Sequence, residues 1–152
     1  MKKRENMSVV RLVAVILAVA LMLPVGANAA VVETVQPCAS YYLDSYNAYV
    51  YPAGNGQIQV WFTVTGTGYM ETLGALTIKI YESKDNCTWT WVKSYSNGNY
   101  PEMLGYNDYF YSSHVDYQGV AGMYYKAYVC IWAGEDGGGD TRYFYTSSKL
   151  AT

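Results

Sequence analysis

Aromatic side chains are the residues of this sequence best suited to binding chemistry, and the chain holds 18 tyrosines and 4 tryptophans. Flat rings flanked by polar groups can stack on sugar rings or bury a protein partner, because Tyr and Trp offer large contact areas at low entropic cost. Alternation along two predicted neighbouring strands directs one group of side chains outward on a single face. Its members are Lys79, Tyr81, Tyr124, Lys126, Tyr128 and Trp132. We expect these six to bind a ligand, and the competing interpretation is cross-strand pairing that only stiffens the sheet.

The remaining tryptophans are expected away from this face. Trp61 falls on the opposite sheet of the predicted fold. Trp89 and Trp91 alternate after a predicted turn, and we expect each ring to fold over its own strand pair rather than to contact a ligand.

Catalytic chemistry has little support in the residue types. A Ser or Cys nucleophile usually needs a His base, and the only histidine, His114, lies in a predicted strand without an accompanying nucleophile motif. Glycosidase chemistry needs two carboxylates in a cleft, whereas the acidic residues here fall mostly in turns. We therefore expect no catalytic residue, no cofactor and a protein that is not an enzyme.

Metal ligation has equally little support. Zinc needs several His or Cys ligands at short spacing, a pattern that the sequence lacks. Glu135, Asp136 and Asp140 of the segment GEDGGGD (134–140) have the oxygens that calcium prefers, but not the acidic spacing of an EF-hand. We expect this segment to bind no metal and to form a flexible connection, with its glycines allowing a wide turn.

The three cysteines, Cys38, Cys87 and Cys130, allow at most one internal disulfide. In a seven-stranded sandwich the start of the first strand lies at the same end as the turn after the sixth. This topology favours a bridge between Cys38 and Cys130, which would contribute roughly 2–4 kcal/mol. Three unpaired thiols are the alternative.

The first 29 residues have the organisation of a secretory signal peptide. Lys2, Lys3, Arg4 and Arg11 precede an apolar run over 12–25, and Ala27-Asn28-Ala29 supplies a cleavage site. The run is shorter than a membrane-spanning helix needs, and a retained anchor is the alternative. We expect residues 1–29 to be removed, 30–40 to be an extension, and the protein to be secreted without stable membrane insertion.

The charge of the chain argues against nucleic acid as a partner. Lys and Arg number 10 and Asp and Glu 12, so the formal net charge is −2. Loss of residues 1–29 removes four basic groups and Glu5, which shifts the net charge to −5. An acidic secreted domain of this kind repels polyanions as a whole.

Period-two alternation rich in Val, Ile, Thr, Tyr and Trp recurs throughout the mature chain and predicts an all-β domain over 41–152. Between the strands lie clusters of Gly, Asn, Asp or Pro, including PAGNG at 52–56 and the Gly66–Gly68 segment, which we expect to end a strand. Seven strands are predicted: Tyr41–Tyr51, Gln57–Thr65, Leu76–Tyr81, Thr88–Tyr95, Tyr109–Tyr117, Met123–Ala133 and Arg142–Ser148.

Seven short strands in a domain of this length favour an immunoglobulin- or fibronectin type III-like sandwich. Tyr125 strengthens this prediction, because it enters the sixth strand two residues before the inward Ala127, as the tyrosine of a tyrosine corner does.

Several segments resemble an uncharacterised family of small secreted proteins from anaerobic Gram-positive bacteria. They are YLDSYNAYV (42–50), GTGYMETLGALTIKIYES (66–83) with a following Trp, GVAGMYYKA (119–127) and AGEDGGGDTR (133–142). The resemblance implies a secreted β-sandwich and assigns no catalytic residue; the cysteines and the extra tyrosines depart from the pattern.

Together these features predict a secreted, non-catalytic β-sandwich that acts as a binding or interaction module, with an extracellular protein or polysaccharide as its partner. A carbohydrate- or cell-wall-binding module that uses exposed aromatics is one alternative. A secreted antibacterial or effector protein is another, and an enzyme would require two carboxylates converging on a deep pocket.

Overall fold

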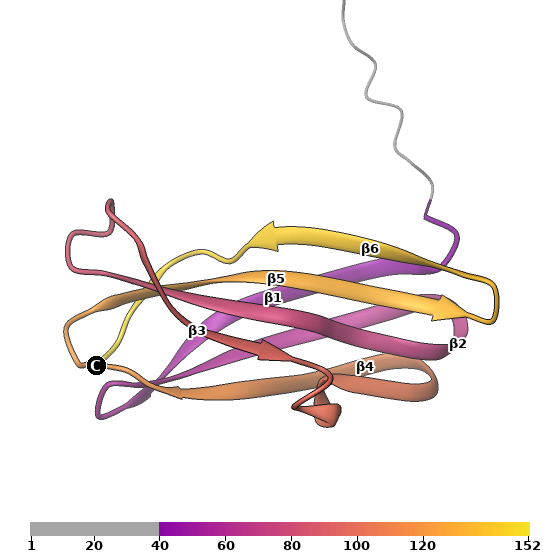
Figure 1. The fold of residues 1–152 in the computed structure, drawn as a ribbon, viewed down its shortest axis with the longest axis horizontal. Helices are drawn as coiled ribbons and strands as arrows, with labels where there is room; N and C mark the ends of the chain where they lie inside the picture. The colour runs from indigo at the N-terminus through magenta and orange to yellow at the C-terminus, as the bar shows by residue number, and fades with distance from the viewer. Residues whose placement is uncertain (1–39) are drawn as a thin grey trace, which may run out of the picture. The chain divides into compact units, whose positions relative to one another are not determined.

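The computed structural model describes residues 40–152, and the expected signal peptide, most of the N-terminal extension and Cys38 lie outside this range. The chain is all-β (Figure 1), with one short 3-10 helix, η1, at Pro101–Met103. Within the described part, no helix is long and apolar enough to cross a membrane. The strands are β1 (Leu43–Gly54), β2 (Gln57–Ser83), β3 (Thr90–Ser96), β4 (Leu104–Gln118), β5 (Tyr124–Glu135), β6 (Gly138–Tyr145) and β7 (Lys149–Leu150).

A two-residue turn joins β1 to β2 within the predicted PAGNG break. Asn55 and Gly56 have φ angles of 53° and 76°, the left-handed pair that a type I′ turn requires. A side chain at Gly56 would also meet the backbone of Ala121, 2.7 Å from the added Cβ. Glycine therefore satisfies both the turn and the close approach of the 119–122 segment.

The prediction of separate strands at Gln57–Thr65 and Leu76–Tyr81 is wrong, because β2 runs through both and through Gly66–Gly68. Thr67 keeps this segment paired: its amide donates to the Tyr42 carbonyl and its hydroxyl to the Tyr41 carbonyl. The pairing with β4 shifts register between Thr65 and Met70. Figure 1 shows β2 bending back at this end, so the glycines fold the strand over without ending it.

The two halves of β2 have different neighbours. The first half pairs with β1 on one side and β4 on the other, whereas the second half pairs with β5 and with β3; between them, Thr72–Gly74 pairs with both β4 and β5. β6 extends the sheet beyond β5, and the short β7, which the sequence did not predict, pairs with the start of β5. The seven strands thus form one sheet, and its bend brings the two halves of β2 into facing layers.

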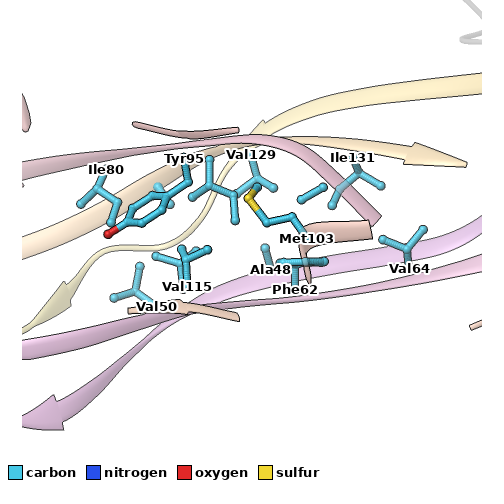
Figure 2. Close-up of a cluster of buried hydrophobic side chains, with 14 of the residues drawn as sticks. Ala48, Val50, Phe62, Val64, Ile80, Tyr95, Met103, Val115, Val129 and Ile131 are labelled. Atoms are coloured by element: carbon cyan, nitrogen blue, oxygen red, sulfur yellow. The ribbon is translucent and has the colours of Figure 1, made fainter. Parts of the chain in front are cut away.

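The core lies between these two layers (Figure 2). Ala48, Phe62 and Val115 project from β1, β2 and β4 toward Ile80 and Val129 on the opposite side. Met103 of η1 fills the space between the layers and is fully buried. Complete burial of a side chain of this size contributes roughly 1.5–3 kcal/mol, so the alternating apolar positions hold the layers together.

Tyr125 links the start of β5 to the preceding loop. Its ring is fully buried, and its hydroxyl accepts a hydrogen bond from the Val120 amide at 2.9 Å. The same hydroxyl donates to the Glu82 carboxylate at 3.3 Å. A loop-to-strand hydrogen bond of this kind is the geometry expected at a tyrosine corner, and Ala127, two residues later, is buried as predicted.

Candidate binding face

Four of the six residues predicted to bind a ligand meet on the outer surface of β2 and β5. Lys79 lies opposite Tyr128, and Tyr81 lies opposite Lys126, so lysine and tyrosine alternate both along and across the strands. Their neighbours in the chain are fully buried: Ile78 and Ile80 of β2 and Ala127 and Val129 of β5. Because strand side chains alternate between faces, burial of these neighbours directs the four predicted residues outward.

β6 adds two tyrosines that the sequence prediction omitted. Tyr145 lies opposite Tyr128, and Tyr143 lies opposite Cys130. The Tyr128 ring centroid is 4.7 Å from that of Tyr145 and 6.1 Å from that of Tyr143, the latter pair being stacked. Tyr81 also approaches Tyr145, with 5.9 Å between ring centroids. Tyr143 and Tyr145 nevertheless remain 62% and 54% exposed, so they present most of the accessible ring surface.

Lys126 is held between two aromatic rings. Its Nζ lies 4.2 Å from the centroid of the Trp89 ring and 4.9 Å from that of Tyr145. Cation–π attraction at these distances restricts the lysine and fixes the ring of Trp89, which precedes β3, beside the outer surface of β5. We call the assembled surface the tyrosine face, and its residues are Lys79, Tyr81, Trp89, Lys126, Tyr128, Tyr143 and Tyr145.

The surroundings of Tyr143 and Tyr145 raise the pKa of both phenols. Partial burial, the nearby Tyr81 and a hydrogen bond to it raise the pKa of Tyr145, against the opposing effect of Lys79. A hydrogen bond with the Cys130 thiol is the main cause of the raised pKa of Tyr143. The hydroxyl groups of Tyr143 and Tyr145 are therefore neutral at neutral pH.

Trp132, which we predicted to bind a ligand, packs against the β5–β6 hairpin, and its role in binding stays a prediction. Its Nε1 donates to the Thr72 hydroxyl at 2.9 Å, and its half-buried ring lies against the backbone of Gly134 and Gly139. A side chain at either glycine would overlap the ring, so the glycines make room for it. The prediction of a wide turn over 134–140 is wrong, because only two residues separate β5 from β6 and the rest of the segment is paired.

Tyr124 lies at the end of the tyrosine face, two residues before Lys126 on β5. It begins β5, where it faces Ser83 on one side and Leu150 of β7 on the other. Its side chain is half-buried. The sequence showed the outward direction of Tyr124 but not β7, whose two residues give no strand pattern.

Cys130 lies within β5, inside the strand predicted over Met123–Ala133. Its side chain is only 3% exposed, and its strand neighbours are Thr77 and Tyr143. Burial raises the pKa of the thiol. Cys130 and the exposed Cys87 are both free thiols in the structure, and Cys38 lies outside the described residues, so the Cys38–Cys130 bridge stays a prediction.

Asp140, one of the three acidic residues considered as calcium ligands, has other partners. The carboxylate of Asp140 accepts hydrogen bonds from the Ser40 hydroxyl and the Tyr42 amide, and these bonds lower its pKa. Asp140 thus anchors the chain just before β1. Over residues 40–152, no three His, Cys, Asp or Glu side chains are grouped closely enough to hold a metal ion.

The outer surface of the other layer carries a second, smaller cluster. Trp61 lies there as predicted, and the ring of His114 stacks on it with 4.3 Å between centroids. Trp61 Nε1 donates to Gln59, and Gln59 donates to Asp116, which lies 3.6 Å from His114 Nε2. His114 is therefore held by an aromatic stack and a carboxylate on a half-buried surface.

Two pockets of the described chain are lined by residues outside the tyrosine face. One is lined by Glu82, Ser83, Lys84, Asp85, Thr88, Thr90 and Met123, and the other by Lys93, Tyr95, Tyr100, Glu102, His114, Val115 and Asp116. The tyrosine face contributes no residue to either pocket and presents its side chains on an open strand surface.

Comparison of the chain with protein families, with curated proteins and with solved structures found no match.

Proposed function

We propose that this protein is a secreted, non-catalytic binding module and that the tyrosine face is its binding surface. The observation that carries the proposal is the convergence of aromatic and cationic side chains from β2, β5, β6 and the segment before β3, with Tyr143 and Tyr145 left largely exposed. Its partner is an extracellular protein or polysaccharide.

The proposed scaffold is an immunoglobulin- or fibronectin type III-like sandwich. β1, the first half of β2 and β4 would form one sheet, and β3, the second half of β2, β5 and β6 the other. The core between the layers and the hydrogen bond of Tyr125 support this assignment. Such a scaffold holds a binding surface on rigid strands, where the positions of side chains are fixed by pairing.

Secretion is supported by the sequence alone. The basic residues and apolar run over 1–25, followed by Ala27-Asn28-Ala29, have the order of a signal peptide. The resemblance to small secreted proteins points the same way. A protein with a secretory signal peptide acts outside the cell, where surface polysaccharides and proteins are the available partners.

The alternative is that the tyrosine rings only stiffen the sheet. It differs from the binding proposal in how much ring area should remain exposed to solvent. Rings that serve cross-strand pairing alone gain nothing from exposure, whereas Tyr and Trp at binding surfaces keep one side accessible. Tyr128 is already flanked by other rings, but Tyr143 and Tyr145 at the sheet edge are more than half exposed. Tyr51 of β1 is 53% exposed as well, so the support for binding comes from exposed rings that lie beside the lysine of the same face, as Tyr145 does beside Lys126.

A binding array of extracellular glycans, cell-wall polymers and surface proteins tests the proposal. The test variant is Tyr143→Ser with Tyr145→Ser, and the matched control is Tyr49→Ser with Tyr51→Ser, which removes two tyrosines of 45% and 53% exposure from β1. We expect a ligand whose affinity falls at least about tenfold in the test variant only, because exposed aromatics dominate binding energy. Equal affinity of both variants for every bound ligand would refute the proposal.

A further inference from the structure

The distribution of charge points to the chemistry of the ligand. Asp and Glu outnumber Lys and Arg from Ser40 onward, yet no acidic residue occurs in 77–81 of β2, 126–132 of β5 or 141–145 of β6. These three stretches form the tyrosine face, which carries Lys79 and Lys126. A cationic surface on an otherwise acidic domain attracts an anion locally, and the rest of the domain repels it.

We propose that the tyrosine face binds an acidic polysaccharide, a chain of pyranose rings that bear carboxylate groups. This inference rests on the proposed function and names the ligand class of the same surface. The two lysines would pair with carboxylates, and the exposed tyrosines would stack on the apolar faces of the sugar rings.

The lysines are placed to bind carboxylates. Lys126 is restrained between Trp89 and Tyr145, so little further side-chain entropy is lost when it pairs with an anion. Lys79 is exposed beside Tyr128, one strand away from Lys126 and offset along the sheet. Two cations at separate positions match a ligand that repeats its charge along a chain.

The tyrosines supply the contacts that a sugar requires. The rings of Tyr143 and Tyr145 are largely exposed, and their hydroxyls remain protonated at neutral pH, so they can donate to sugar oxygens. Stacking on a ring face together with hydrogen bonding at its edge fits a pyranose, which has an apolar face and a polar rim.

The open shape of the face favours a polysaccharide over an acidic peptide or a small acid. Protein partners are usually anchored by side chains that fill well-packed pockets, and small ligands bind in concave sites. Both pockets described above are formed by other residues. An extended polymer that lies across β2, β5 and β6 needs no pocket, because it gains affinity from several adjacent contacts.

Three soluble polymers test the inference with the purified protein. Polygalacturonate carries carboxylates on a sugar chain, its methyl-esterified form keeps the sugars without the charge, and poly-glutamate carries carboxylates on a peptide. We expect binding to polygalacturonate, at least about tenfold weaker binding to the other two, and a loss of affinity as salt rises from about 0.05 M to about 0.5 M.

Matched lysine variants locate the interaction. Lys79→Gln with Lys126→Gln should lower affinity for polygalacturonate roughly tenfold, whereas Lys84→Gln with Lys149→Gln, which removes two exposed lysines elsewhere, should leave it unchanged. Lys79→Gln alone serves as a second variant, because no aromatic ring holds its exposed side chain and the fold does not depend on it.

Each contrary result overturns a defined part of the inference. Equal affinity for poly-glutamate would remove the sugar requirement, and equal affinity for the esterified chain would remove the requirement for acid. Failure to bind any of the three polymers would overturn the inference entirely. The proposed function would survive these results if the array reveals another ligand that depends on Tyr143 and Tyr145, and would fall with them if it does not.

Discussion

The contact between Trp132 and the glycines of the β5–β6 hairpin can be tested by adding one methyl group. Gly139→Ala would place a Cβ within overlap distance of the six-membered ring of Trp132. The ring cannot move freely, because Nε1 is bonded to Thr72 and Gly134 lies beneath the same ring. Either the ring leaves its position or β6 separates from β5.

Both routes cost free energy of a predictable size. Insertion of a methyl group into a packed contact costs typically about 1–3 kcal/mol, and a lost hydrogen bond about 0.5–1.5 kcal/mol. We expect Gly139→Ala to lower the free energy of unfolding by about 2 kcal/mol. Gly98→Ala is the matched control, since an added Cβ there meets no atom within 4 Å, and it should change stability by less than about 0.5 kcal/mol.

Denaturant unfolding followed by fluorescence measures the cost, and a double-mutant cycle assigns its cause. In a Trp132→Leu background the obstructing ring is gone, so Gly139→Ala should cost less than about 0.5 kcal/mol. An equal cost in both backgrounds would refute the reasoning, because backbone conformation rather than the ring would then require glycine at 139.

Three further predictions follow from titratable groups. Burial raises the pKa of Tyr95 to about 12. The protonated Tyr95 side chain therefore contributes fully to stability below about pH 10, the pKa of an unfolded tyrosine, and this contribution is lost as pH rises toward 12. The loss of stability at alkaline pH should be smaller in Tyr95→Phe than in the unmodified protein. Because the pKa of Asp140 is lowered from 3.8, the ionised carboxylate stabilises the fold above that pH, and this stabilisation is lost as pH falls through the pKa of the folded protein. Between pH 7 and pH 2 the melting temperature should therefore fall less in Asp140→Asn than in the unmodified protein. Mass spectrometry after brief alkylation should find Cys87 modified and Cys130 protected until the protein is unfolded, and rapid modification of Cys130 would contradict its burial.

The all-β class and most strand positions could be predicted from alternation, because burial of one face leaves a period of two in the sequence. The continuation of β2 through Gly66–Gly68 could not be predicted. Gly66–Gly68 has the composition of a turn, and only the pairing of Thr67 with the start of β1 shows that the chain bends there while still hydrogen-bonded. That pairing joins residues distant in the sequence, which local propensity does not encode.

The tyrosine face could be predicted in its centre but not at its margins. Lys79, Tyr81, Lys126 and Tyr128 follow from alternation on two strands and their adjacency. Tyr143 and Tyr145 lie on a predicted strand, and their alternation was a usable signal once that strand was placed beside β5.

The positions of the Trp89 and Trp132 rings could not be predicted from strand alternation. Trp89 precedes β3 and reaches the face through its contact with Lys126, which no sequence period reveals. Trp132 has the outward direction that alternation predicts, but its ring is turned onto Gly134 and Gly139. Alternation predicts which side of the sheet a side chain lies on, but not its rotamer. Whether a large ring is exposed also depends on neighbouring glycines, which leave room for the ring to lie flat on the backbone.

The continuity of β2 has a consequence for how the molecule opens. Strands β1, β3, β4 and β5 all pair with this one segment, so if β2 leaves the sheet each of them loses that pairing, and only the pairing of β5 with β6 and β7 remains. The first and second halves of β2 can be released independently only if the bend at Gly66–Gly68 acts as a hinge, and Thr67 ties that bend to the start of β1. Amide hydrogen exchange across both layers should therefore report a single cooperative opening, with separate, faster exchange confined to β6 and β7 at the margins.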